Sequence, residues 1–133
     1  MKMKPIYMNT GVLAYIGDAA YELHIRRHIV GRGLVRADRL HSSAVRFVRA
    51  DAQAGFIRKI LHKLPEEEVA LVKRARNHKI SSKPKNANPV DYKWATAFEA
   101  LLGYYYLSGQ EEKLEETIEG ALEYIGGEKN EQG

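Results

Sequence analysis

The chain has 133 residues, of which 44% are hydrophobic and 29% charged, a size and composition typical of one globular domain. It contains no cysteine, which excludes disulfide bonds and thiolate metal sites, and it has no apolar run of the ~20 residues that a membrane span needs. The net charge of +4 is uneven, because residues 108–133 hold eight Glu and two Lys, which leaves +10 on residues 1–107.

A body this basic favours a polyanionic partner such as nucleic acid, with ordinary solubilising charge as the alternative. Residues 1–8 are expected to be a loose lead-in, and they contain no signal-peptide pattern, so we expect a cytoplasmic protein. No stretch shows the alternation of a strand, and apolar residues recur at helical spacing. We therefore predict an all-α fold, with a single domain over residues 1–133.

The first predicted helix begins at Asn9 or Thr10, which are favourable N-caps, and ends at Gly31 and Gly33. Asp18 lies beside the apolar stripe of this helix. A short carboxylate in such surroundings must be paired, must hold a metal, or must cost stability. The residues expected to form the core stripe are Val12, Ile16, Ala19 and Leu23.

Residues 36–63 predict two short helices with a break near Arg49–Asp51. Another helix is expected to start at Leu64–Glu68, with proline in the first turn and acids facing the positive end of the helix dipole, and to end near Arg76. Residues 77–90 contain two prolines, three lysines and no acid, which indicates an exposed loop.

A second apolar helix follows, with Asp91 as its expected cap and Glu99 as an isolated acid inside it. After Gly109 a last amphipathic helix is expected to carry its glutamates on the outside, and residues 126–133 are expected to fray. Tyr104–Tyr106 cannot all face one side of a helix, so we expect one or two of them to fill the core or an interface.

Asp18 and Glu99 are thus two carboxylates on two apolar helices, an arrangement that suggests a metal site between packed helices. Mg²⁺ takes oxygen ligands and often only one or two protein carboxylates, and it can activate water beside a phosphate. The alternatives are a salt bridge from Asp18 to an arginine, and a surface position for Glu99, paired with Lys93 or unpaired. Glu22 could assist the metal or pair with Arg26 one turn on.

Two stretches resemble the acidic motifs of the ribonuclease III catalytic domain, in the same order and at a similar separation. Tyr15–Ala19 resembles the signature stretch, and Thr96–Gly103 resembles the second motif. The Mini-ribonuclease III group, which lacks the double-stranded-RNA-binding domain, is more similar still. Its resemblance rests on residues 13–19, 74–77, 84–86 and 96–101, and the 30 residues after Gly103 are too few for the missing domain.

The chain departs from full-length ribonuclease III at two positions. That family has a glutamate where this chain has Ala14, and an aspartate where it has Thr96. Two of the family's four metal-binding carboxylates are therefore missing here. The Mini-ribonuclease III group resembles this chain in lacking them.

The resemblance implies a ribonuclease III-like helical bundle that forms a homodimer. It also implies an Mg²⁺-dependent endoribonuclease that cleaves double-stranded RNA. Asp18 and Glu99 would be the catalytic and metal-binding residues, and the implied substrate is a large-subunit (23S) ribosomal RNA precursor. Because duplex RNA is recognised mainly by shape and backbone, basic residues are the expected contacts. They are Lys79, Lys83, Lys85, Asn86, Arg74, Arg76, Arg26, Arg27, Arg32 and Arg36.

A non-catalytic RNA-binding or ribosome-associated protein with the same fold is the rival interpretation. Ala14 and Thr96 favour it, whereas the presence of both Asp18 and Glu99 argues against it, because a binding module needs neither carboxylate.

Overall fold

A computed structural model describes residues 3–33, 37–78 and 88–132, and these residues form helices without strands, as predicted. No helix in these ranges is long and apolar enough to cross a bilayer. The elements in chain order are η1 (Pro5–Tyr7), α1 (Thr10–Gly31), α2 (Ala37–Val48), α3 (Ala50–Ile60), η2 (Leu61–Lys63), α4 (Glu66–Asn77), α5 (Pro89–Leu107) and α6 (Glu111–Gln132).

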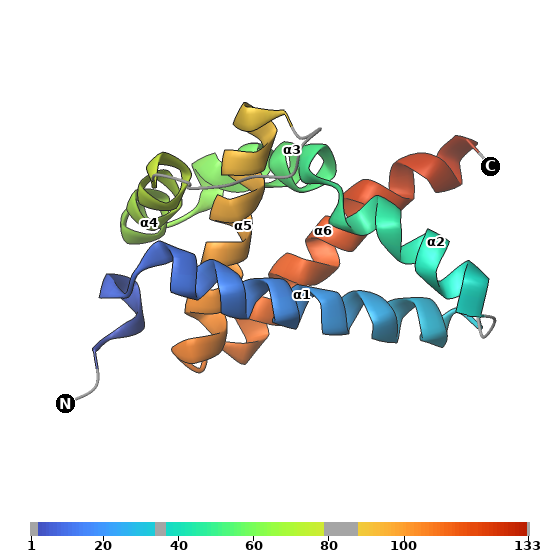
Figure 1. The fold of residues 1–133 in the computed structure, drawn as a ribbon, viewed down its shortest axis with the longest axis horizontal. Coiled ribbons are helices and arrows are strands. Elements are labelled where there is room, and N and C mark those ends of the chain that lie inside the picture. The colour runs from blue at the N-terminus through green and yellow to red at the C-terminus, as the bar shows by residue number, and fades with distance from the viewer. Residues whose placement is uncertain (1–2, 34–36, 79–87, 133) are drawn as a thin grey trace.

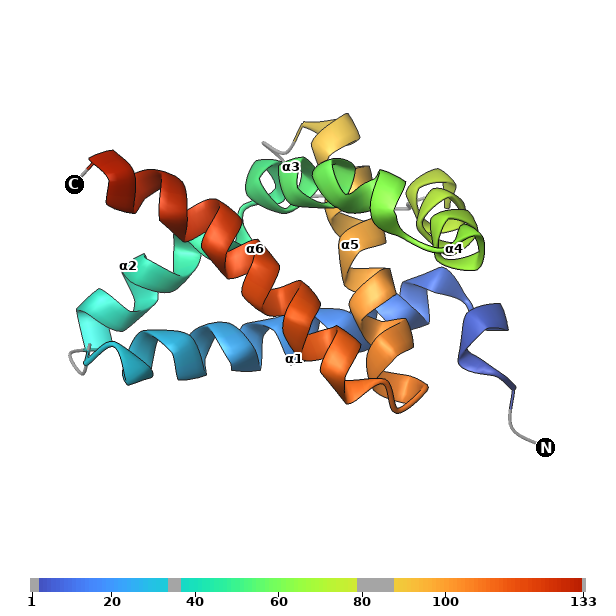
Figure 2. The same ribbon diagram turned by 180° about the vertical axis from the view of Figure 1, so that it is seen from behind.

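Helix α5 is the centre of the bundle and packs against α1, α3, α4 and α6. Figure 1 shows α1 crossing in front of α5, with α3 and α4 beside the first half of α5. Seen from behind in Figure 2, α6 runs diagonally across the opposite side. Residues of α5 therefore meet α1 on one side and the other helices on the remaining sides.

The helix ends follow local capping chemistry. The Asn9 side chain accepts hydrogen bonds from the backbone N–H groups of Gly11 and Val12, at 2.7 and 3.3 Å, and so caps α1 as predicted. The predicted break between α2 and α3 occurs at Arg49, whose backbone is extended. The cap of α5 is Asn88, not Asp91, because the Asn88 side chain accepts from the backbone N–H of Asp91 at 3.1 Å.

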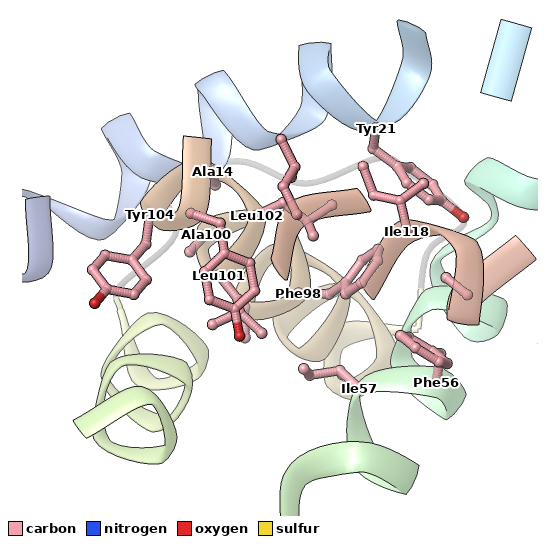
Figure 3. Close-up of a cluster of buried hydrophobic side chains, with 14 of the residues drawn as sticks. Ala14, Tyr21, Phe56, Ile57, Phe98, Ala100, Leu101, Leu102, Tyr104 and Ile118 are labelled. Carbon is pink, nitrogen blue, oxygen red and sulfur yellow. The ribbon is translucent and has the colours of Figure 1, made fainter. Parts of the chain in front are cut away.

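The core lies around α5 (Figure 3). In that cluster the ring of Tyr21 from α1 meets Phe98 from α5 edge-on, with ring centres 5.2 Å apart. Phe56 from α3 packs on the same Phe98 ring at 5.7 Å. Two of the three consecutive tyrosines, Tyr104 and Tyr105, are buried, as expected.

The predicted core stripe of α1 is wrong. Val12 and Leu23 are 47% and 67% exposed, Ala19 is exposed, and Ile16 is only partly buried. The buried line repeats every four residues and includes a glycine, because α5 crosses α1 more closely than an apolar side chain would allow. Its members are Leu13, Gly17, Tyr21, Ile25 and Ile29.

Both ends of the described chain contain helical residues. The lead-in forms the short helix η1, and the Arg74 guanidinium donates hydrogen bonds to the carbonyl groups of Ile6 and Met8, at 2.9 and 3.3 Å. At the other end α6 extends to Gln132, and the expected fraying of residues 126–133 stays a prediction.

Glu68 is a buried acid that the sequence did not identify. It is 2% exposed and lies on α4. The Tyr105 hydroxyl donates to its carboxylate at 2.6 Å, and the Lys113 ammonium lies 3.3 Å away. The three residues tie α4, α5 and α6 together.

Candidate active site

Two glycines set the closest approach of α1 and α5. A Cβ atom on Gly17 would overlap the carbonyl oxygen of Glu99 and stand 2.8 Å from the Gly103 nitrogen. A Cβ atom on Gly103 would likewise overlap the carbonyl oxygen of Leu13. Real Cβ atoms do not approach so closely, so only glycine at both positions permits this crossing.

The crossing places Asp18, the residue after Gly17, beside Glu99. The two carboxyl groups are within hydrogen-bonding reach of each other. Asp18 is exposed and Glu99 is partly buried. Burial of Glu99, its hydrogen bond with Asp18 and the Asp18 charge together raise the pKa of Glu99 to about 9. Near neutral pH Glu99 therefore keeps its proton in the metal-free protein.

Tyr21 lies near this pair but is not available as an acid or base. Burial and, to a smaller extent, the charge of Glu99 raise the pKa of Tyr21 well above its usual range. Its hydroxyl donates to the Phe47 carbonyl at 2.8 Å. We therefore assign Tyr21 to the core.

The donor set of the pair fits a hard divalent cation. Two carboxylates held together without a cation cost electrostatic energy, and a cation bound between them would relieve that cost. Within the described ranges no three acidic or histidine side chains are placed to hold one metal ion, so these residues supply the two carboxylates of the pair and no third ligand of this kind. Ala14 is buried, and the Thr96 hydroxyl donates to the backbone carbonyl of Tyr92 at 2.9 Å, so neither replaces the family's missing acids.

The three arginines predicted as RNA contacts in and just after α1 have different surroundings. Arg26 forms an ion pair with Glu22 at 2.8 Å, which confirms the pairing expected for Glu22. Arg27 lies 3.9 Å from Glu115 of α6. Arg32 is exposed directly after the end of α1.

The remaining predicted contacts divide into two groups. Arg74 is bound to the lead-in, as described above, and Arg76 lies over a tryptophan ring. The others lie outside the described residues and stay predictions; they are Lys79, Lys83, Lys85, Asn86 and Arg36.

Arg58 and Trp94 were absent from the predicted site. The structure places the Arg58 guanidinium 5.2 Å and the Arg76 guanidinium 4.9 Å from the centre of the Trp94 ring. The available sequence signal was the chain's one tryptophan, which lies shortly after the basic segment 77–90.

Comparison with known proteins identifies the family. The Ribonuclease III domain family matches residues 11–110. Mini-ribonuclease 3 of Brevibacillus brevis is 48% identical over 93% of this chain and 92% of its own length. Mini-ribonuclease 3 of Symbiobacterium thermophilum is 43% identical over 91% and 93%. A crystal structure of a Fusobacterium nucleatum protein superposes with a TM-score of 0.79 at 35% identity, covering 88% of this chain and 94% of that one.

Proposed function

This chain belongs to the ribonuclease III family, in its Mini-ribonuclease III group, and is an endoribonuclease; we propose that it hydrolyses double-stranded RNA with Mg²⁺ at Asp18 and Glu99. The observation that carries the proposal is the contact between these two carboxyl groups at the glycine crossing of α1 and α5. Non-catalytic RNA binding, the rival interpretation, does not agree with this family.

Asp18 and Glu99 would hold the cation, one from each helix. A bound Mg²⁺ supplies an activated water and neutralises the charge that develops on the scissile phosphate. Gly17 and Gly103 fix the separation of the two helices and hence of the two carboxylates. In the part of the chain that the structure describes, no side chain is placed to act as a separate nucleophile. We therefore assign the protein the roles of holding the ion and orienting the RNA.

The RNA would be recognised through its backbone, which is how proteins read most double-stranded RNA. Arg26 and Arg27 present positive charge on the second half of α1, and Arg32 adds another directly after the helix ends. The lysines of the segment 77–90 lead into the helix that carries Glu99 and are proposed to contact phosphates beside the carboxylates. The implied natural substrate is a stem of the large-subunit ribosomal RNA precursor in the cytoplasm.

A homodimer is proposed because α1 has an apolar face that its own core does not cover. Tyr15 is 79% exposed, and it lies on α1 with the exposed Val12, Ala19 and Leu23 at helical spacing. An exposed apolar stripe of this kind is typical of an interface. Two copies related by a two-fold axis would supply one carboxylate pair for each RNA strand.

Incubation with RNA tests this function directly. The wild-type protein is mixed with a long RNA duplex, with the separated strands, and with a precursor-rRNA stem, in Mg²⁺ and in EDTA. We expect both strands of the duplexes to be cut in Mg²⁺ only, with the separated strands spared. Cleavage that persists in EDTA would refute the metal site, and equally fast cleavage of single strands would refute the substrate.

A further inference from the structure

Three side chains from three helices meet beside the first half of α5. Figure 1 shows α3 and α4 lying next to this half of α5. They are Arg58 of α3, Arg76 of α4 and Trp94 of α5, and we name them the arginine–tryptophan cluster. The guanidinium carbons of Arg58 and Arg76 lie 5.2 and 4.9 Å from the ring centre. Both distances are within the ~6 Å range of cation–π attraction.

The cluster concentrates positive charge without a compensating acid. The two guanidinium groups are at most about 10 Å apart, the sum of their distances to the ring centre, so they repel each other. Among the described residues neither Arg58 nor Arg76 has a carboxylate within ion-pairing distance, whereas Arg26, Arg27 and Arg49 each have one. An anion near both guanidinium groups would offset this positive charge.

The guanidinium groups of Arg58 and Arg76 lie over the Trp94 ring and keep N–H groups that form no hydrogen bond within the described residues. A guanidinium group contacts an aromatic ring through its face and binds a phosphate through the N–H groups at its edge. Arg58 is exposed. Arg76 is partly exposed and, among the described residues, donates one hydrogen bond, from its Nε–H to the Asn77 side chain at 3.1 Å. The Trp94 ring already restrains both side chains. Binding an anion here would therefore cost less conformational entropy than binding it with two arginine side chains that contact no ring.

We propose that the arginine–tryptophan cluster binds the phosphodiester backbone of duplex RNA at a site separate from the carboxylate pair. The identity of the polyanion rests on the proposed function. Trp94 and Glu99 lie five residues apart on α5, which is about 7.5 Å along the axis and about 140° around it. The cluster therefore contacts a stretch of backbone other than the scissile phosphate and fixes the position of the duplex relative to Asp18 and Glu99.

Binding of a long RNA duplex across a salt series tests the proposal. The background is Asp18→Asn in the full chain, so that RNA is not cut. Arg58→Gln and Arg76→Gln are made singly and together. We expect the double variant to bind at least tenfold more weakly, and the slope of log affinity against log salt to fall by about one per lost phosphate contact.

The matched control is Arg49→Gln, which removes one exposed charge from an arginine held by Asp51. It should bind within twofold of the background. Trp94→Leu keeps both charges but removes the stack, and it should weaken binding while leaving the salt slope closer to that of the background. Circular dichroism melting checks that each variant is folded.

The proposal is overturned if the double arginine variant binds within twofold of the background with the same salt slope. It is also overturned if Arg49→Gln weakens binding as much as Arg58→Gln. The proposed function is judged separately, by cleavage with the wild-type protein. A wild type that leaves duplex RNA intact but binds it through Arg58 and Arg76 refutes the nuclease site and supports the cluster.

Discussion

Gly17 of α1 lies directly against the carbonyl group of Glu99 in α5. A Cβ atom at Gly17 would stand 2.7 Å from the Glu99 carbonyl carbon, so the close crossing exists only because position 17 has no side chain. Asp18 follows Gly17, and this backbone contact brings the two carboxyl groups together. The geometry of the site thus depends on a residue that carries no functional group.

Gly17→Ala should therefore destabilise the fold and reduce cleavage together. The added methyl group would collide with backbone atoms of Glu99 and Gly103, which cannot move aside as a side chain can. Overpacking of this kind lowers the free energy of unfolding by about 1–3 kcal/mol. Urea denaturation measures the loss. Gly127→Ala in α6 is the control, because a Cβ atom there meets nothing within 4 Å, and it should gain up to about 1 kcal/mol from helix propensity. A Gly17→Ala protein as stable as the Gly127→Ala protein would contradict the crossing.

The metal-free protein should lose stability as pH rises. Because the pKa of Glu99 is raised from 4.5 to about 9, the folded state binds this proton more tightly than the unfolded state. The stabilisation is complete below about pH 4.5 and is lost progressively towards pH 9. In EDTA, Glu99→Gln should show a smaller fall in unfolding free energy than the wild type over this range. Parallel curves would show that Glu99 is not protonated in the folded state.

Tyr105→Phe should destabilise the protein by about 1.5–3 kcal/mol, because the hydroxyl donates to the buried carboxylate of Glu68 at 2.6 Å. Tyr106→Phe is the matched control, since Tyr106 is 55% exposed and should change stability by no more than about 0.5 kcal/mol. Thermal melting of both variants measures the difference. Equal melting temperatures would mean that Glu68 is satisfied without Tyr105.

Leu23→Glu should convert the proposed dimer to a monomer, because it places a charge on the exposed apolar face of α1. Sedimentation velocity at micromolar concentration measures the species present. Val90→Glu changes another exposed apolar residue, on α5, and should remain dimeric. A monomeric wild type would reject the interface.

The helices were predictable because their signals are local. Asn9 caps α1, and Pro65 with the acids after it marks the start of α4. The face that α1 buries was not predictable, because apolarity favours Val12 and Leu23, whereas the partner helix requires Gly17.

Of the contacts between residues far apart in the sequence, the sequence predicted one carboxylate pair and missed a buried acid. The pairing of Asp18 with Glu99 was a hypothesis from two isolated acids in apolar helices. Glu68 has no such signal, because nothing in its own stretch separates it from the acids beside it. Its burial depends on Tyr105 and Lys113, which lie far along the chain.

The central claim, that Asp18 and Glu99 act as one Mg²⁺ site, is tested most directly by cleavage of a long RNA duplex. Single-turnover rates are measured in Mg²⁺ for the wild type, Asp18→Asn, Glu99→Gln and the double variant. We expect each single variant to abolish cleavage while keeping helical content and RNA binding, and the double variant to be no worse than either, because residues that serve one site have non-additive effects. Cleavage within tenfold of the wild type by either single variant would contradict the account.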